Sequence, residues 1–416
     1  PGLRVIGRTS SFALKGASDD LRSIGKRLGA SNLLEGSVRK SGTRVRITAQ
    51  LIEATNGTHL WSQEFDRQLD DVFAVQEEIA RAVVSALKVK LLPRQADVAR
   101  AADPRAHDQY LLGVAYLARG SWSSFERAVK ALRDAVAIDP GYASAWAALS
   151  MALFWHGDQA PDGNPATEWA EALAAADKAI ALAPEGAEGW RARGLVREGA
   201  RQDWQGALAD LERARTLAPQ NPLVLSLYAT LLAALGQLSA AIPLVQEAAV
   251  LDPLAPDILA NLSSAYLGTG QLPLAEEAAR RALETAPDHG RAARNLGFAL
   301  LLQGRLEEAR TAFLRSSNAL FRSMGEVLVA KSRGQADDAQ RLLDRMEATL
   351  PDSSSYQLAQ MNAWLGSRDK AFAWLDRAVK AHDAGLLYLK YDPFLRSLRD
   401  DPRYADLLAR LKLPPG

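Results

Sequence analysis

Side chains that could carry catalytic chemistry are few and far apart in this sequence. The five histidines stand at positions 59, 107, 156, 289 and 382, and no two have the spacing of metal ligands. Cysteine is absent, which excludes disulfides, thiolate metal sites and cysteine nucleophiles. Glu35 and His59 could form an acid–base pair on adjacent strands. A partly buried sheet position and an interfacial histidine explain them better, so we predict no catalytic residue, no cofactor and no metal site.

Two asparagines point to binding instead. Asn261 and Asn295 lie 34 residues apart and occupy equivalent positions in neighbouring copies of an alanine-rich repeat. The amide of an asparagine can bind both the N–H and the C=O of a peptide backbone. Alternatively, both amides form hydrogen bonds within or between helices of the protein itself. The spacing leaves both interpretations open.

A basic strand near the amino terminus is the other candidate surface. Arg44 and Arg46 alternate along the segment RVRIT, and Trp61 on a neighbouring strand could stack on a base. Acidic residues between positions 53 and 71 reduce the positive potential. Alternate arginines are also typical of a sheet with one solvated face. We therefore predict a solvated face, with a protein interface or a nucleic-acid contact as the alternatives.

Composition restricts the possible functions further. The 416 residues include 50 basic and 49 acidic ones, a net charge of +1 that argues against a general nucleic-acid footprint. No apolar run approaches the roughly 20 residues of a membrane span. The sequence begins PGLRVIG without an initiator methionine, so we expect a fragment whose upstream part is missing.

The first ninety residues show the alternation and turn signals of an α+β unit. Asn56-Gly57 is a strong hairpin signal between two of its strands. The pattern predicts helices on one face of the sheet. In chain order it predicts a strand at 3–8, a helix at 19–29, strands at 33–38, 43–54 and 58–65, and a helix at 70–92.

Three stretches of this unit resemble a known family. They read LRVIGRTSSFALKG, LGASNLLEGSVRKSGTRVRITAQLIEATNGTHLWSQEFDR and DVFAVQEEIARAV. Together they closely resemble a bacterial domain that is similar to the amino-terminal domain of TolB. The resemblance implies no catalytic residue. It implies tetratricopeptide repeats downstream, and an adenylate cyclase, winged-helix or kinase domain upstream.

The same resemblance also has implications for the completeness of the sheet and for the cellular compartment of the domain. The family begins with a further strand and helix, with motifs like LPF and YFADG, which are absent here, so we expect an open sheet edge. Family members with a preceding membrane span hold this domain outside the cytoplasm, whereas cyclase members without one hold it inside. The wording FAVQEEIARAVVSALKV is closer to the membrane-attached members.

The remainder of the chain is repetitive. Prolines that end similar segments stand at 140, 184, 219, 253 and 287, and the last three intervals are 35, 34 and 34 residues. Thirty-four residues is the tetratricopeptide period. Small residues recur at fixed distances before the prolines, as Ala207 and Ala214 show, where two helices would cross closely. The longer interval before Pro184 indicates an insertion around HGDQAPDGNPATEW.

These observations predict a mainly α fold: a right-handed tetratricopeptide-repeat superhelix of about eight helix-turn-helix units, of which the sixth to eighth are degenerate. A small α+β domain precedes it, with a truncated sheet, a three-strand meander and helices. The predicted divisions are a TolB-like domain at 1–92, a linker at 93–105, the repeats at 106–383 and capping helices at 384–416.

In tetratricopeptide superhelices the first helix of each unit lines a concave surface where extended peptides bind. Asn261, Arg291 and Asn295 resemble half of the carboxylate clamp of some such proteins, but Ser226 and Thr230 replace the lysine and asparagine of that clamp. The predicted binding residues of the concave surface are Asn261, Ser264, Arg291, Arg294 and Asn295, and those of a secondary interface are Arg44, Arg46 and Trp61.

The function that we predict is a non-catalytic sensory or assembly module of a bacterial signalling or regulatory protein, with a protein or peptide ligand in the groove of the repeats. The alternative is the regulatory carboxy-terminal portion of an adenylate cyclase or winged-helix transcription regulator. For nucleic acid, we expect contacts by an upstream domain rather than by these residues.

Overall fold

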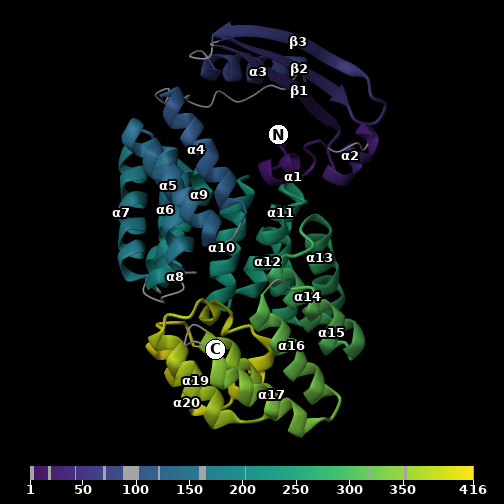
Figure 1. Cartoon of the computed structure of the whole chain (residues 1–416), viewed down its shortest axis with the longest axis vertical. Helices are drawn as coiled ribbons and strands as arrows, with labels where there is room; N and C mark the ends of the chain where they lie inside the picture. Colours follow the sequence, from purple (N-terminus) through teal and green to yellow (C-terminus); the bar gives the residue numbers. More distant parts are fainter. Residues whose placement is uncertain are drawn as a thin grey trace.

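The structure is a computed structural model that combines a small α+β unit with a long array of paired helices. It describes residues 4–16, 20–42, 44–68, 72–87, 103–119, 122–158, 165–201, 203–316, 318–350 and 354–415. Figure 1 shows the sheet over one end of the array and the carboxy terminus near the other end. The mainly helical fold with a small amino-terminal sheet is as predicted. The predicted linker at 93–105 lies mostly outside the described residues.

The α+β unit contains an antiparallel sheet with the strand order β1-β2-β3. The hairpin signal Asn56-Gly57 is confirmed, because Gly57 has a φ of 75° in the turn that joins β2 to β3. The elements of the unit are α1 (Arg8–Ala13), α2 (Leu21–Leu28), β1 (Asn32–Ser41), β2 (Arg44–Glu53), β3 (His59–Gln68) and α3 (Val72–Ala86).

Two expectations for this unit are wrong. Residues 4–7 form no strand, and α1 begins at Arg8. The backbone N–H of Gly7 donates instead to the carbonyl oxygen of Leu251 in the helical array, at 2.6 Å. Nor do the helices share one face of the sheet. Only α3 covers a face, around Ala49, Phe65 and Val75, whereas α2 packs at the strand ends in a cluster that includes Leu33.

Eight antiparallel helix pairs follow the α+β unit within the described residues. The pairs are α4 (Pro104–Leu117) with α5 (Trp122–Ile138), α6 (Ala143–Asp158) with α7 (Ala166–Leu182), α8 (Ala187–Arg201) with α9 (Trp204–Leu217), α10 (Pro222–Ala234) with α11 (Leu238–Leu251), α12 (Pro256–Thr269) with α13 (Leu272–Thr285), α14 (Gly290–Leu302) with α15 (Leu306–Leu314), α16 (Ala319–Ser332) with α17 (Ala336–Thr349), and α18 (Ser355–Leu365) with α19 (Arg368–Lys380). The chain then forms the 3₁₀ helices η3 (Ala384–Tyr388) and η4 (Pro393–Leu398) and the helix α20 (Pro402–Arg410).

Local sequence signals explain where the second helix of a pair ends. Each of the five repeat prolines stands two residues beyond the end of such a helix, where it breaks the helical hydrogen-bond pattern. Trp146 and Trp190 occupy equivalent positions in the helices that follow. Their indole Nε1 atoms donate to the carbonyl oxygens of Pro140 and Pro184, at 2.9 and 2.8 Å. The same turn is therefore built from the same residues in consecutive units.

Small residues let the two helices of a pair approach each other. A methyl group added to Gly194 would lie 2.8 Å from the side chain of Leu211, and one added to Gly297 would lie 2.5 Å from the ring of Phe313. The alanines predicted at these crossings, Ala207 and Ala214 among them, are fully buried. Larger side chains at these positions would force the helices apart.

The irregular units of the sequence keep the pairing of their helices. In the second unit, which carries the insertion, α6 has 16 residues and α7 has 17, a length that α5 of the first unit also has. In the sixth unit, where the repeat period breaks, α15 has only 9 residues. The break in the period thus shortens one helix while the pairing of helices is kept.

A buried carboxylate joins the α+β unit to the array. Asp252, which follows α11 and is 1% exposed, accepts hydrogen bonds from the backbone N–H of Ser10, at 2.7 Å, and from the Ser10 hydroxyl. The Ser10 Oγ in turn accepts from the N–H of Leu254 at 2.8 Å, and the Leu254 side chain packs in the cluster around Leu33. The turn between α11 and α12 is therefore part of both units.

We predict that Asp252→Ala releases α1 from the array. The substitution leaves two buried donors of Ser10 without an acceptor, at a cost of roughly 1–3 kcal/mol for each buried unsatisfied group. Hydrogen–deuterium exchange of residues 8–13 should become about 10–100-fold faster. Asp252→Asn, which keeps a carbonyl oxygen at the same place, should have a much smaller effect. Unchanged exchange in Asp252→Ala would show that Asp252 does not hold α1.

Candidate functional site

The predicted binding asparagines join three consecutive repeats. Asn261 on α12 donates from Nδ2 to the hydroxyl of Ser226 on α10, at 3.1 Å. Arg291 on α14 donates from Nη1 to Oδ1 of Asn261, at 2.8 Å. The Nδ2 of Asn295 donates to the carbonyl oxygen of Ala260 at 3.0 Å and to the hydroxyl of Ser264 at 2.8 Å. The equivalent positions therefore do meet across repeats, through hydrogen bonds within the protein.

These residues differ in how far a ligand could reach them. Asn295 is 1% exposed, and Ser264 and Arg294 are also buried. Asn261 is partly exposed, and 34% of the Arg291 side chain is accessible. The structure therefore divides the predicted set into a buried part that holds α12 and α14 together and an accessible part, Asn261 and Arg291.

Acidic and basic groups alternate around Arg291. Its Nη2 atom forms an ion pair with Asp257, one helical turn before Asn261 on α12. Asp257 also contacts Nε2 of His289, at 3.2 Å. The side chain of Asp257 is mostly exposed, so the charge of this pair faces the groove. An incoming peptide would meet an arginine, a carboxylate and an amide within one repeat spacing.

The carboxy-terminal segment enters the concave surface beside these residues. Tyr388, at the end of η3, lies against Arg294, with 5.2 Å between the guanidinium carbon and the ring centroid. Burial raises the pKa of Tyr388, but Arg291 and Arg294 more than offset this effect, so that its pKa lies below the ordinary value. Two guanidinium groups therefore converge on one phenol oxygen that the carboxy-terminal segment supplies.

Contacts far apart in sequence hold residues 384–415, which we call the tail, in this position. The Nζ of Lys390 donates to the carbonyl oxygen of Leu235 at the end of α10, at 3.2 Å. The indole of Trp204 on α9 donates to the carbonyl oxygen of Leu411, at 2.7 Å. Phe394 packs against Phe298 on α14 with its ring tilted, at 4.5 Å between ring centroids. The tail thus touches both sides of the superhelix.

The last helix of the tail lies along the last repeat. Arg403 and Arg410 on α20 form ion pairs with Asp369 and Asp376 on α19, at 2.8 and 2.6 Å. A buried hydrogen bond of 2.7 Å from the hydroxyl of Tyr356 to Asp392 fixes the segment between η3 and η4 on α18. The tail is therefore packed on the final repeat and on the groove at once.

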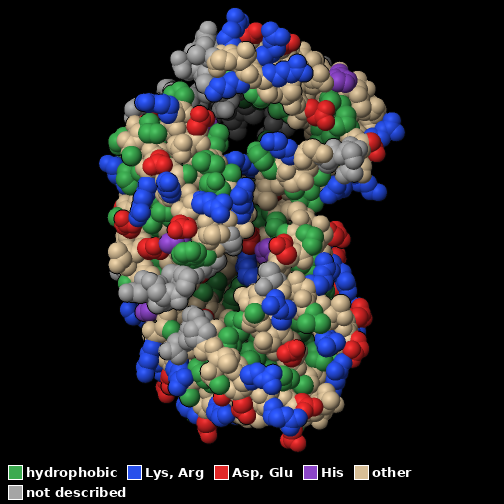
Figure 2. Space-filling view, in the orientation of Figure 1, with side chains coloured by type: hydrophobic (Ala, Val, Ile, Leu, Met, Phe, Trp, Pro, Cys, Tyr) green, Lys and Arg blue, Asp and Glu red, His purple; other side chains and the backbone are tan. Residues whose placement is uncertain are grey.

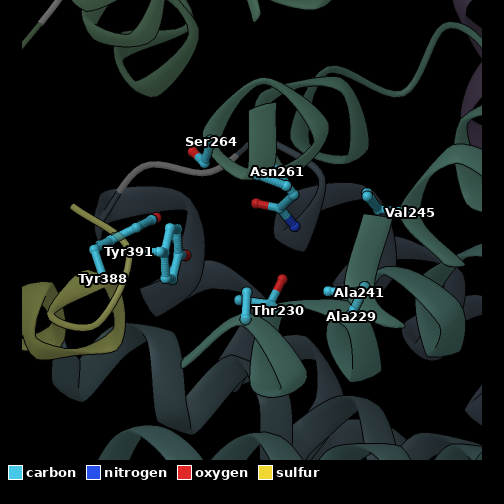
Figure 3. Close-up of a pocket in the computed structure, with 10 residues that line it drawn as sticks. Ala229, Thr230, Ala241, Val245, Asn261, Ser264, Tyr388 and Tyr391 are labelled. Atoms are coloured by element: carbon cyan, nitrogen blue, oxygen red, sulfur yellow. The ribbon is translucent and has the colours of Figure 1, made fainter. Parts of the chain in front are cut away.

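A small cavity remains where the tail meets the first helices of the repeats. Figure 3 shows Tyr388 and Tyr391 of the tail opposite Thr230 of α10 and Asn261 of α12. Its volume of about 10 Å³ is enough for one water molecule. The cavity is too small for a peptide side chain, whereas Figure 2 shows a wider hollow between the two sides of the array.

The residues that the sequence analysis missed are those of the tail. The aromatic residues of YLKYDPF, at 388, 391 and 394, are spaced by three and were a visible signal, because exposed solvent-facing segments seldom carry three large rings. Nothing in the repeat period indicates that this segment turns back into the groove. Its contacts with α9, α10 and α14 span from about 90 to more than 200 residues.

The predicted secondary interface is divided between the two faces of the sheet. Arg44 contacts Asp66 at 2.9 Å, and Arg46 contacts Glu64 and Asp66, both at 3.1 Å. These exposed ion pairs lie on the face opposite α3. Trp61 pairs with Leu51 on the other face, where it packs on Phe65. The structure does not bring Trp61 to the arginines.

Glu198 on α8 is a buried carboxyl group with one oxygen that has no hydrogen-bond partner among the described residues. The residue is 4% exposed, and the oxygen without a partner is Oε1. Burial raises the pKa of Glu198 to about 8. Burial raises the pKa of Tyr391 of the tail, and the charges of Tyr388 and Glu198 raise it further. The protonation state of Glu198 on α8 therefore affects Tyr391 in the tail.

Family comparisons identify the central repeats. Two family models, both described as tetratricopeptide repeat, match the array, one at residues 166–222, 228–286 and 260–319 and the other at 200–253. Residues 166–319 are tetratricopeptide repeats. The helix pairs on either side share their arrangement, so the tetratricopeptide fold extends beyond the matched residues.

One curated relative and several solved structures resemble this chain. A putative adenylate cyclase 3 of Rhizobium meliloti (strain 1021) is 44% identical over 154 residues, which are 36% of this chain and 26% of that protein. A chain of the APC/C hetero-tetramer Cut9-Hcn1 is 15% identical, with 81% of this chain and 59% of that chain covered and a TM-score of 0.48. Yeast Tom70 is 16% identical, with 77% and 70% covered and a TM-score of 0.42. Since both scores lie below 0.5, neither likeness carries a functional argument.

We predict that Glu198 makes stability fall as the pH rises. A carboxyl group with a raised folded-state pKa binds its proton more tightly when folded, so stability is full below the unfolded value of about 4.3 and is lost as the pH rises towards 8. Glu198→Gln removes this dependence. The free energy of unfolding of the variant relative to wild type should therefore rise by up to roughly 1.4 kcal/mol per pH unit over this window.

Chemical denaturation at several pH values measures this difference. Glu247→Gln, a substitution at an exposed position on α11, is the matched control and should leave the pH dependence as in wild type. A constant difference between Glu198→Gln and wild type from pH 4 to pH 8 would contradict a buried, protonated Glu198.

Proposed function

We propose that this chain is a non-catalytic binding module of a bacterial sensory or assembly protein, and that a protein or peptide lies in the groove of its repeats. The observation that carries the proposal is the hydrogen-bonded series Ser226, Asn261, Arg291, which follows the concave surface from α10 to α14 with its last two members accessible. Amide and guanidinium groups at the spacing of the repeat fit the regularly spaced polar groups of an extended peptide.

In this proposal the predicted residues have two tasks. Asn261 and Arg291 contact the peptide, whereas Ser264, Arg294 and Asn295 hold α12 and α14 at the correct separation and position Arg291. Tyr388 of the tail forms the wall of the groove opposite them. The described part of the chain holds no helix that could cross a membrane.

The α+β unit is proposed to be a TolB-like domain that passes a change in the array to an upstream output domain. Asp252 supports such a route, because it stands directly before α12, the helix that carries Asn261, and binds α1 of the α+β unit. A peptide that shifts α12 would therefore move the contact between the two units. The exposed Arg44 and Arg46 on one face of the sheet, and the partly buried Trp61 on the other, are secondary interfaces in this proposal.

Mutation of the accessible pair tests the groove. We expect the full chain to capture a partner from the source lysate, and Asn261→Ala/Arg291→Ala to lose it, with at least about tenfold weaker binding of the purified partner by calorimetry. Arg213→Ala/Arg280→Ala, which removes two arginines from exposed ion pairs of α9 and α13, is the control for charge and should bind as wild type does.

Asn295→Ala serves as the folding control in the same experiment. It removes the buried hydrogen bonds of Asn295 and should lower the melting temperature of the chain. Equal capture by wild type and Asn261→Ala/Arg291→Ala would place the partner on another surface and refute the proposal.

A second candidate function has its own support. The relative named as a putative adenylate cyclase favours the alternative that these residues are the regulatory portion of a longer cyclase-type or winged-helix protein. An antibody against the array should then detect, in the source organism, a protein well above the 45.0 kDa of this chain. Its immunoprecipitate should form cyclic AMP from ATP. A band at 45 kDa without cyclase activity would contradict this alternative.

A further inference from the structure

A cleft on the outside of the array lies apart from the groove. It opens between the sixth and seventh repeats, where α15, α16 and α17 meet at the end of the array opposite the sheet (Figure 1). Its volume is about 370 Å³, within the range of roughly 300–1,000 Å³ that is typical of ligand sites. None of its lining residues belongs to the concave set described above.

The cleft lies beside the contracted sixth unit. In the neighbouring fifth and seventh units the second helix has 14 residues, but α15 ends after 9. The ion pair between Arg333, which follows α16, and Glu307, in the first turn of α15, shows that the cleft lies along the amino-terminal half of α15.

Four arginines line the cleft, and two of them have no acidic partner. Arg333 is paired with Glu307, and Arg341 is paired with Asp338. Arg310 on α15 and Arg345 on α17 are exposed, and neither has a carboxylate within ion-pair distance in the described part of the chain. These two guanidinium groups, on opposite sides of the opening, are available to a ligand.

The floor of the cleft is apolar. Val329 and Ala330 of α16 and Leu342 of α17 lie between the charged residues. A ligand would therefore gain from an apolar side chain placed between two acidic ones. Carboxylates are the natural partners of the arginines, since a guanidinium group binds a carboxylate with two parallel hydrogen bonds.

A carboxylate in the cleft favours an acidic peptide over a nucleic acid as the ligand. Glu326 of α16 also lines the cleft and has no basic partner among the described residues. It would repel a continuous line of phosphates, whereas a peptide can present an uncharged residue to it. Among the described residues, no aromatic side chain that could stack on a base lines the cleft.

We propose that this cleft binds an acidic peptide segment of a partner protein, with carboxylates on Arg310 and Arg345 and an apolar side chain on the floor between them. The site is separate from the groove, so a single chain can bind two partners. This second partner would join the array at the end away from the α+β unit.

Fluorescence anisotropy with the full chain tests the proposal. The probe is a fluorescein-labelled peptide of repeated Glu-Leu-Glu, with a Gln-Leu-Gln peptide as the uncharged comparison. We expect wild type to bind only the acidic peptide, and Arg310→Glu/Arg345→Glu to weaken that binding about tenfold or more. Arg22→Glu/Arg396→Glu changes the net charge equally at two exposed positions outside the cleft and should stay within about twofold of wild type.

Other outcomes would overturn the proposal. Equal losses in the two charge-reversal variants would show attraction to overall charge and not to the cleft. Tighter binding of a labelled oligothymidylate, with the same dependence on Arg310 and Arg345, would assign the cleft to nucleic acid. No binding of the acidic peptide would refute the site. Should Arg310→Glu/Arg345→Glu fail to fold by circular dichroism, Arg310→Gln/Arg345→Gln provides the same comparison.

Discussion

The close crossing of the two helices in each pair is the constraint on which the rest of this structure depends. Gly194 against Leu211 and Gly297 against Phe313 leave no room for a further methyl group, and the equivalent places of other units hold small residues, namely Ser150, Ala229 and Ser263. Because each pair is packed at this short distance, consecutive pairs stack with the same offset and their first helices line one surface. The concave groove is therefore a consequence of small residues at fixed intervals and not of any single binding residue.

The two ends of the chain attach to the array at different places. At one end, the α+β unit attaches to the turn before α12 through Asp252 and Ser10. At the other, the tail turns back over α14 and reaches α9 and α10, so that Tyr388 becomes part of the concave surface. Asn261 and Arg291 remain accessible beside these attachments. The position of the attachments makes α12 the helix through which a bound peptide, the tail and the α+β unit can affect one another.

The 34-residue period made the helical array predictable from the sequence. The tail, and the contacts between the α+β unit and the array, follow no such period and could not be predicted. The 34-residue spacing placed Asn261 and Asn295 on adjacent repeats, because any residue pair at that distance is carried to neighbouring positions. The same argument could not tell that Asn295 is buried, since its side chain is bound by Ala260 and Ser264 of the preceding repeat. Ser10 and Asp252 are 242 residues apart, and Trp204 and Leu411 are 207 apart. No local pattern encodes such contacts, and an alternating apolar sequence at 3–8 consequently suggested a strand where the chain instead binds the array.

The central claim is that the tail is a fixed wall of the groove. The absence of cysteine makes this directly measurable, because Leu223→Cys on α10 and Arg396→Cys on η4 introduce two exposed labelling sites and no others. Double electron–electron resonance between spin labels at these sites reports their distance in solution. A docked tail predicts one narrow distance distribution that agrees with the structure. A broad distribution, as of a detached segment, would contradict the account and leave the whole concave surface open.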